Sequence, residues 1–208
     1  MTDDERDGGT DSWTSGGAAA LATYAPGVLA TYETLVSVRP SGVHDEMLES
    51  PDVVAFAEQF RADVSAIDDP LRAAFLRATG DRSTAVAQMV WISDVSPRLR
   101  AALDALFGPS DEWPGRRRYP VADTGVAIEA FLQSVTDRTE ATREEPTDRP
   151  DAAGAALALA DAMLRTPTAI PQAVVEAVHE LLTPAEAVET VLDGACRSAG
   201  KIGVALAA

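Results

Sequence analysis

Residues 182–208 read LTPAEAVETVLDGACRSAGKIGVALAA, and their apolar side chains recur at the spacing of an α-helix. Thr183, Pro184 and Glu186 form a capping box, with the threonine as N-cap and the glutamate three residues later. One face of the following helix would collect Val188, Val191, Leu192, Ala195, Ala199, Ile202 and Leu206. We therefore expect one long, amphipathic final helix capped by Thr183.

The same helical period runs through the chain from residue 18 onward, and no convincing alternation of period two interrupts it. Residues 52–67 and 124–135 each place an apolar stripe on one helix face, and Asp52 and Asp123 are their predicted N-caps. The sequence therefore predicts an all-α protein.

A further helical stretch follows Asp81, its predicted N-cap, and carries a broad apolar face that includes Trp91. Pro97 lies in the middle of this stretch. Because proline lacks the amide hydrogen and its ring clashes with the preceding turn, we expect a kink or a break there. Gly108 is the expected stop.

The order of segments suggests one compact domain with two helical halves. Residues 1–17 are polar and acidic and are expected to be a disordered tail. The N-terminal half covers 18–108, a Pro/Gly-rich linker covers 109–122, and the C-terminal half covers 123–208. Within that half, residues 136–151 are charged and contain two prolines, so a solvated loop is expected.

Composition excludes several classes of partner. The chain has 208 residues with 17 Lys plus Arg against 33 Asp plus Glu, for a net charge of −16. Such a surface repels nucleic acid and anionic lipid. No apolar run approaches a membrane span, and the first residues lack the apolar core of a signal sequence. A single cysteine implies no disulfide, so a cytoplasmic location is expected.

The two halves share their order of helices and caps. Ile67 corresponds to Ile170, 103 positions later, and the predicted caps Asp81 and Thr183 lie 102 positions apart. Identities are few, but helix lengths agree. We interpret the chain as a degenerate tandem duplication of three-to-four-helix units that pack about a pseudo-two-fold axis.

The C-terminal stretch DAMLRTPTAIPQAVVEAVHELLTPAEAVETVLDGACRSAGKIGVALAA resembles the carboxymuconolactone decarboxylase-like proteins, the superfamily that includes alkylhydroperoxidase D. The matching pieces are the Pro-flanked short helix, LTPAEAVETVL and CRSAGKIGVAL. The stretch VSPRLRAALDALFG and Trp113 add to the likeness, which covers roughly residues 25–206. The resemblance implies a helical bundle of two pseudo-repeats that self-associates into a homo-oligomer.

In peroxidase members of that superfamily the chemistry sits on a helix with Cys-x-x-Cys, because one thiolate attacks the peroxide and the second resolves the sulfenic acid. The resemblance places this helix between Phe131 and Ala155. That segment contains neither Cys nor His, and two prolines interrupt it. The chain is therefore expected to be a degenerate member without dithiol peroxidase activity.

Cys196 is the only cysteine and is either a core residue or a residual one-cysteine redox site. Its predicted place is the middle of an apolar helix, where burial raises the pKa of a thiol and makes it inert. Arg197 follows in sequence but points about 100° away on a helix. We favour a structural role for Cys196.

His44 and His179 are the only histidines. His179 lies on one helix face with Glu176, a pair that could transfer a proton or bind metal, although one helix supplies only two ligands and catalytic zinc needs three. The preferred interpretation is a partly exposed helix pair, and neither a metal nor a cofactor is expected. A metal site would again be possible if the side chains of His44 and His179 lay close together in the fold.

Asp94 interrupts an apolar face, and Arg98 follows at i+4. The two either neutralise each other near the core or anchor a ligand between the halves. Trp91 is either core or the wall of a ligand site. Arg197 and Lys201 form another i, i+4 set, which suits either the helix dipole or capture of a carboxylate.

Two classes of function remain open. The first is a non-redox descendant that binds a small metabolite, with or without lyase or isomerase chemistry. Its weak catalytic candidates are Asp94, His179 and Cys196, and its weak binding candidates are Trp91, Arg98, Arg197 and Lys201. The second is a non-catalytic scaffold or partner subunit. A buried charged cluster in a pocket favours the first, and a solid core with an exposed apolar patch favours the second.

Overall fold

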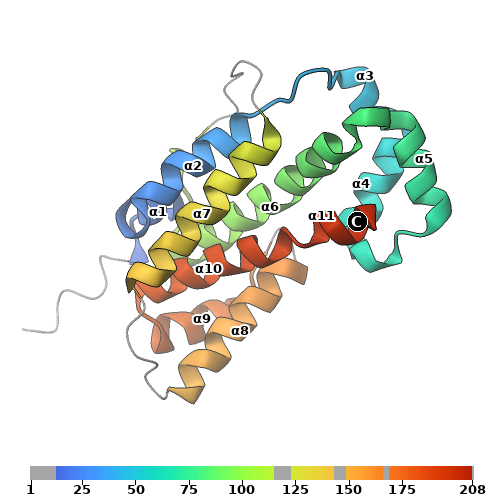
Figure 1. The fold of residues 1–208 in the computed structure, drawn as a ribbon. Coiled ribbons are helices and arrows are strands. Elements are labelled where there is room, and N and C mark those ends of the chain that lie inside the picture. Colours follow the sequence, from blue (N-terminus) through green and yellow to red (C-terminus); the bar gives the residue numbers. More distant parts are fainter. Residues whose placement is uncertain (1–12, 115–122, 143–148, 166–168, 208) are drawn as a thin grey trace, which may run out of the picture.

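The computed structural model describes residues 13–114, 123–142, 149–165 and 169–207, and within these ranges it contains helices and no strands (Figure 1). The first part of the chain forms α1 (Gly17–Tyr24), α2 (Pro26–Ser37), α3 (Asp45–Leu48), α4 (Pro51–Asp63), η2 (Val64–Ala66), α5 (Asp69–Thr79), η3 (Gly80–Arg82) and α6 (Ser83–Phe107). The second part forms α7 (Thr124–Thr142), α8 (Pro150–Arg165), α9 (Gln172–Leu181), α10 (Pro184–Ser198) and α11 (Lys201–Leu206). The predicted all-α class is confirmed.

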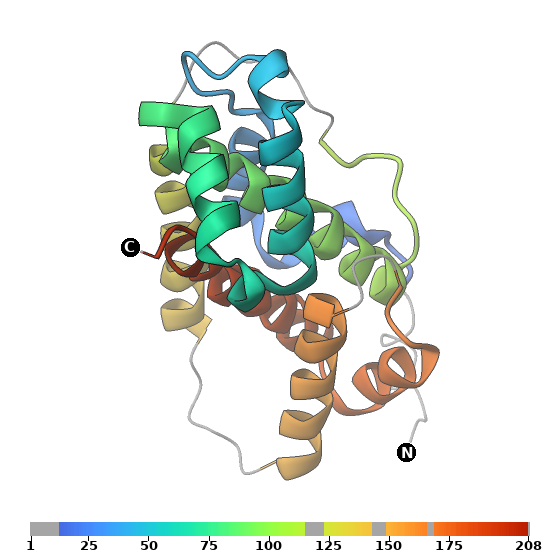
Figure 2. The same ribbon diagram turned by 90° about the vertical axis from the view of Figure 1, so that its right-hand side faces the viewer.

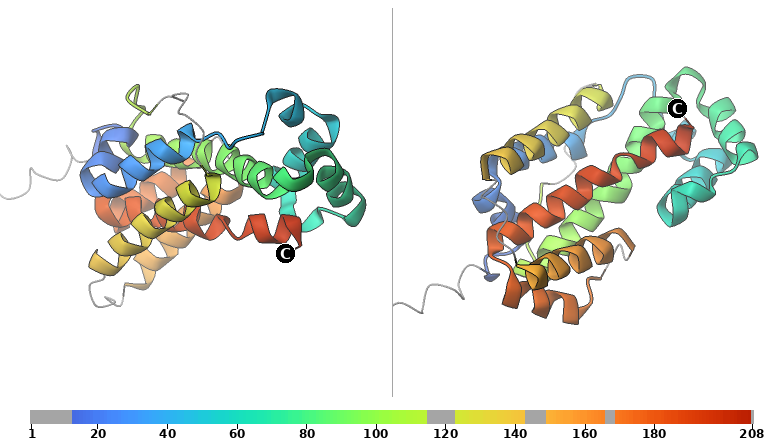
Figure 3. Two further views of the ribbon diagram at one scale, coloured as in Figure 1. Left: turned by 45° about the horizontal axis from the view of Figure 1, so that its top comes forward. Right: turned by 60° about the horizontal axis from the view of Figure 1, so that its bottom comes forward.

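Two central helices organise the bundle. α6 runs through the middle, and α10 with α11 lies along it (Figure 3). α2 packs against α7 and α1 against α6, while α4 and α5 pair at one end of α6 and α8 and α9 pair at the other (Figure 2). Every outer helix thus covers a face of the α6–α10 pair or of a helix that contacts it.

The core follows the apolar stripes read from the sequence. Its largest fully buried side chains are aromatic and leucine residues, and Phe56 of α4 stacks on Phe75 of α5 with 3.8 Å between the ring centroids. Trp91 is fully buried in α6. Burial of each aromatic side chain removes about 150–250 Å² from water, so each of these residues contributes strongly to the stability of the core.

The predicted caps have mixed outcomes. Thr183 forms both bonds of the capping box with Glu186, and the Asp123 carboxylate accepts from the amide of Gly125, so both are confirmed. Asp52 and Asp81 are wrong. α4 begins at Pro51 with Asp52 inside its first turn, and Asp81 belongs to the 3-10 turn η3. A proline prefers the first helical turn, which moves the start of α4 ahead of Asp52.

Pro97 does not break its helix, so the break that was one of the two expected outcomes is wrong. α6 is continuous from Ser83 to Phe107 and contains Pro97 on an exposed position. The proline removes one backbone hydrogen bond, but the helix buries thirteen side chains along its length. Tertiary packing of that size outweighs the loss of about 3 kcal/mol for an interior proline.

The final helix, in contrast, is interrupted where continuity was expected. α10 ends at Ser198 and α11 begins at Lys201, with Ala199 and Gly200 between them. Because Gly200 has low helix propensity, an interruption of the helical hydrogen bonds costs little there. The Arg72 guanidinium holds α11 by donating to the carbonyl of Ala205 at 3.0 Å.

Two segments expected to be irregular are partly ordered. Trp13 and Gly17 were placed in the tail of residues 1–17, but Trp13 stacks on Phe107 with 5.0 Å between ring centroids and Gly17 starts α1. Burial of an indole explains this early start. Residues 1–12 lie outside the described part.

The charged stretch 136–151 is also not a loop throughout. Residues 136–142 are the last turns of α7, and Arg138 in them lies 3.4 Å from the carboxylate of Glu189 on α10. Pro150 and Asp151 open α8. Residues 143–148 of the expected loop and 115–122 of the expected linker 109–122 lie outside the described part, and residues 109–114 are not helical.

Candidate functional site: a buried charge cluster and an adjoining groove

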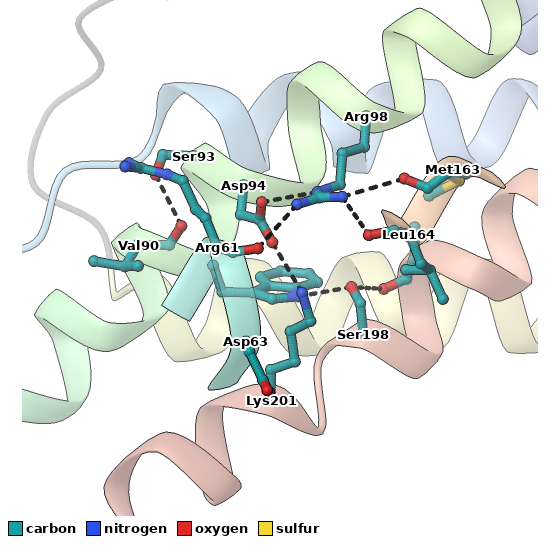
Figure 4. A network of polar contacts seen from close by, with 12 residues as sticks. Arg61, Asp63, Val90, Ser93, Asp94, Arg98, Met163, Leu164, Ser198 and Lys201 are labelled. Carbon is teal, nitrogen blue, oxygen red and sulfur yellow. Dashed lines mark hydrogen bonds and ion pairs between the residues drawn. The ribbon is translucent and has the colours of Figure 1, made fainter. Parts of the chain in front are cut away.

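Three charged side chains meet in the interior where α6 faces the end of α10. The Arg98 guanidinium donates to the Asp94 carboxylate at 2.8 Å, and the Lys201 ammonium lies 3.2 Å from the other oxygen of that carboxylate (Figure 4). Asp94 is 4% exposed and Arg98 is 3% exposed, whereas Lys201 is 22% exposed. The predicted i, i+4 pair is therefore present and fully enclosed.

The remaining N–H donors of Arg98 bind main-chain carbonyl oxygens. One terminal nitrogen donates to Met163 at 3.3 Å and to Leu164, both at the end of α8, and the other donates to the carbonyl of Arg61 in α4 at 3.4 Å (Figure 4). A single guanidinium thus connects α4, α6 and α8. The cluster is satisfied by the protein itself and leaves Arg98 no free face for a ligand.

Trp91 belongs to the same interior region. Its indole nitrogen donates to the Ser198 hydroxyl at 2.9 Å, and that hydroxyl donates to the carbonyl of Ala195 at 2.6 Å. Trp91 is fully buried and does not line either of the two hollows described below. Its geometry is that of a core residue with one satisfied polar atom.

Cys196 lies on α10 and is half-buried. Burial, followed by the negative charge of Asp193, raises the pKa of its thiol from about 9 to about 12. The thiolate, which is the reactive form, is therefore nearly absent at neutral pH. This agrees with a structural role for Cys196.

Arg197 and Lys201 do not form a joint anion site. The Arg197 guanidinium turns outward to Asp193 at 2.8 Å and is 77% exposed, while Lys201 turns inward to Asp94. Lys201 also lies 5.8 Å from the centre of the Phe60 ring. The expected alternative of shared carboxylate capture is wrong because the two side chains already pair with different carboxylates of the chain.

His179 is attached to the end of α6, with a ring nitrogen 2.9 Å from the carbonyl of Leu106 and Trp13 packed against the ring. Its helix, α9, and α3, which follows His44, lie at opposite ends of the molecule (Figures 1 and 2). The two histidines do not meet. Within the described ranges no cluster of three or more His, Cys, Asp or Glu side chains could hold a metal ion.

A groove of about 740 Å³ opens beside the cluster, between α2, α4 and α6. We call it the α2–α4 groove. Its volume lies within the 300–1,000 Å³ typical of small-molecule sites. The apolar side chains on its walls are mostly buried in the core, and they include Val36, Val53, Ala57, Met89, Val90 and Ile92.

Five of the thirteen lining residues carry polar side chains. Arg39 and Asp45 pair with each other at 2.5 Å, Ser37 is only 8% exposed, and the Arg61 guanidinium donates to the Ser93 hydroxyl at 3.2 Å. The Ser37 hydroxyl makes no hydrogen bond to another side chain or carbonyl in the described part of the chain. An apolar surface with a few convergent polar groups is the usual composition of a ligand site.

A second hollow of about 260 Å³ shares Val36, Ile92 and Ser93 with the groove and extends it along α6 to Arg100. The Arg100 guanidinium is already engaged. It donates to the Tyr32 hydroxyl at 3.0 Å and to the carbonyl of Pro114 at 2.6 Å, and it packs on the Trp113 ring. This end of the hollow is therefore fixed by the protein.

Sequence reasoning missed the groove residues. Arg39, Arg61 and Ser93 come from three separate elements, and each one taken alone looks like an ordinary surface residue of a helix or loop. The one available signal is the position of Arg61, which directly follows Phe60 at the border of the apolar stripe of α4. That signal is too common to single out a site.

The chain matches no family model, no curated protein and no solved structure. No helix in the described ranges combines the length and the apolar character needed to cross a bilayer.

Proposed function

We propose that this protein is a non-redox descendant of an alkylhydroperoxidase D-like fold that binds a small organic molecule in the α2–α4 groove. The observation that carries the proposal is the groove itself, about 740 Å³ in volume, whose walls combine eight apolar residues with five polar ones. The buried cluster of Asp94, Arg98 and Lys201 lies beside the groove.

The arrangement of helices supports the proposed ancestry. α4 packs on α5 and α6, and α8 packs on α9 and α10 in the same order along the chain. The remaining pairs, α2 with α7 and α6 with α10, would be the contacts across a pseudo-two-fold axis. This pattern supports a duplicated unit of four helices.

The non-redox part of the proposal rests on Cys196. It is the only thiol of the chain, and its pKa of about 12 leaves it protonated. No second thiol exists to resolve a sulfenic acid. Dithiothreitol-dependent turnover of hydrogen peroxide that disappears in Cys196→Ser would overturn this part.

Binding is tested by filling the groove. Met89 lines it and is half-buried, so Met89→Trp should occupy its volume with another apolar side chain. Leu76→Trp, at an exposed position of α5, is the matched control. We expect members of a diverse set of small organic molecules to raise the Tm of the wild type and of Leu76→Trp but not of Met89→Trp.

If no molecule raises the Tm, or if Met89→Trp responds like the wild type, groove binding is wrong. The second candidate, a non-catalytic scaffold, would then be preferred. The observation that favours it is the complete internal satisfaction of the Asp94 cluster, which fits a structural role. The large exposed apolar residues, however, lie on different helices: Val54, Leu76, Val126, Leu157 and Val204.

A further inference from the structure

The charge of the α2–α4 groove is opposite to the charge of the chain. The whole chain carries −16, but the walls of the groove and of the adjoining hollow carry Arg39, Arg61 and Arg100 against a single carboxylate, Asp45. An isolated positive patch in an acidic protein attracts anions locally while the rest of the surface repels them. The groove is therefore complementary to a negatively charged group.

The three arginines differ in how many of their N–H donors already bind other groups of the protein. Arg39 is neutralised by Asp45 at 2.5 Å, and Arg100 is held by Tyr32, Trp113 and a main-chain carbonyl. Arg61 makes no ion pair with any described residue, and its guanidinium makes one hydrogen bond, to Ser93. A guanidinium has five N–H donors in a planar fork, so most donors of Arg61 are available.

The main chain and the side chain of Arg61 make different contacts, so a change of the side chain can alter binding without altering the fold. Its main-chain carbonyl accepts from Arg98 in the buried cluster, whereas its side chain is exposed and lies along the groove towards Ser93 (Figure 4). A change of the side chain leaves the carbonyl in place. Ser37, which is buried on the same walls, offers a second hydrogen-bonding group.

We propose that the groove takes an organic anion with an apolar body, such as a medium-chain carboxylate, and that Arg61 binds the carboxylate. The apolar tail would lie on Val53, Ala57 and Val90, where its burial is favourable. The carboxylate would accept two N–H bonds from the Arg61 fork, which is the strong geometry for this pair. This inference rests on the proposed function, because it names the ligand of the same groove.

The test compares three probes of equal length, octanoate, 1-octanol and octylammonium, titrated into the full chain at fixed salt and followed by the amide resonances of α2, α4 and α6. Octanoate should bind most tightly. Arg61→Gln should weaken octanoate by about 10-fold or more, as expected for loss of a charge-assisted hydrogen bond, and leave octanol unchanged. Arg61→Lys should fall between, since it keeps the charge but loses the fork.

Arg77→Gln, an exposed arginine of α5 outside the groove, is the control and should bind octanoate like the wild type. Thermal unfolding of each variant verifies that the fold is retained. If octanol binds as tightly as octanoate and Arg61→Gln has no effect, the anion preference is wrong while groove binding stands. If none of the three probes shifts the groove amides, the anion preference is overturned together with this use of the groove.

Discussion

The Asp94 carboxylate and the Arg98 guanidinium lie 2.8 Å apart with side chains that are only 4% and 3% exposed. They are one turn apart on α6, on either side of Pro97, and Lys201 reaches the same carboxylate from α11. Removal of the carboxylate would leave two cations without their counter-charge, one of them fully buried. A buried pair is costly to break from one side.

We therefore expect Asp94→Asn to lower the free energy of unfolding by about 3–5 kcal/mol, the usual cost of leaving one member of a buried pair uncompensated. Lys201→Met should cost much less, because Lys201 is 22% exposed and its loss leaves Asp94 paired with Arg98. Urea unfolding measures both. Equal losses for the two variants would contradict this account of the cluster.

Only part of the cluster of Asp94, Arg98 and Lys201 could be predicted from the sequence. The spacing of four predicts the Asp94–Arg98 pair, since residues at i and i+4 share a helix face. The contact with Lys201 spans 107 positions, and the carbonyls of Met163 and Leu164 are available only because α8 ends beside α6. Such contacts depend on packing between helices, which periodicity does not specify.

The helices themselves were largely predictable, while their ends were not. The stripes and the Thr183 capping box are local signals and were confirmed. Pro97 and Gly200 mislead because packing decides whether a helix continues through a poor residue. The α2–α4 groove could not be found, because its arginines are unremarkable until α2, α4 and α6 are placed together.

Cys196 should be unreactive in the native protein. With a pKa of about 12, only about one thiol in 10⁴ is ionised at pH 8, against about one in ten for an ordinary cysteine. We expect labelling by a disulfide reagent such as Ellman's reagent to be about 1,000-fold slower in buffer than in denaturing urea. Rapid labelling without denaturant would revive the one-cysteine peroxidase hypothesis.

The same shift affects stability at high pH. Above pH 9 the unfolded state releases the Cys196 proton and the folded state keeps it until about pH 12, so the thiol's contribution to stability falls across this range. The difference in unfolding free energy between wild type and Cys196→Ala should therefore move against the wild type from about pH 9 upward. A difference independent of pH would show that the thiol ionises normally in the fold.

The Trp91–Ser198 hydrogen bond should contribute measurably because both residues are buried. Ser198→Ala leaves the indole N–H without a partner, which should lower the unfolding free energy by about 1–3 kcal/mol. In a Trp91→Phe background the same substitution should cost less, since no donor remains to be orphaned. Equal costs in both backgrounds would mean that Ser198 matters for another reason.

Asp104 offers a prediction of opposite sign to that for a carboxylate whose pKa is lowered by ion pairs or hydrogen bonds. Burial raises the pKa of its carboxyl, although the Trp113 indole donates to it at 2.9 Å and Arg100 lies near. A carboxyl with a raised pKa is easier to ionise in the unfolded state, so stability falls as pH rises through the unfolded value of about 4 and stays lowered at neutral pH.

Asp104→Asn keeps an oxygen that can accept from Trp113 but carries no charge. We expect this variant to be at least as stable as the wild type at pH 7, and its advantage to shrink as pH falls to about 4 and below, where Asp104 is protonated in both states. Asp111→Asn, which removes the same charge from an exposed position, is the control for the loss of one negative charge. Urea unfolding at pH 7, 5 and 4 measures the three proteins. A variant that is less stable at pH 7, with a deficit that shrinks as pH falls to 4, would show that the fold prefers the charged form of Asp104 and that the indole and Arg100 outweigh its burial.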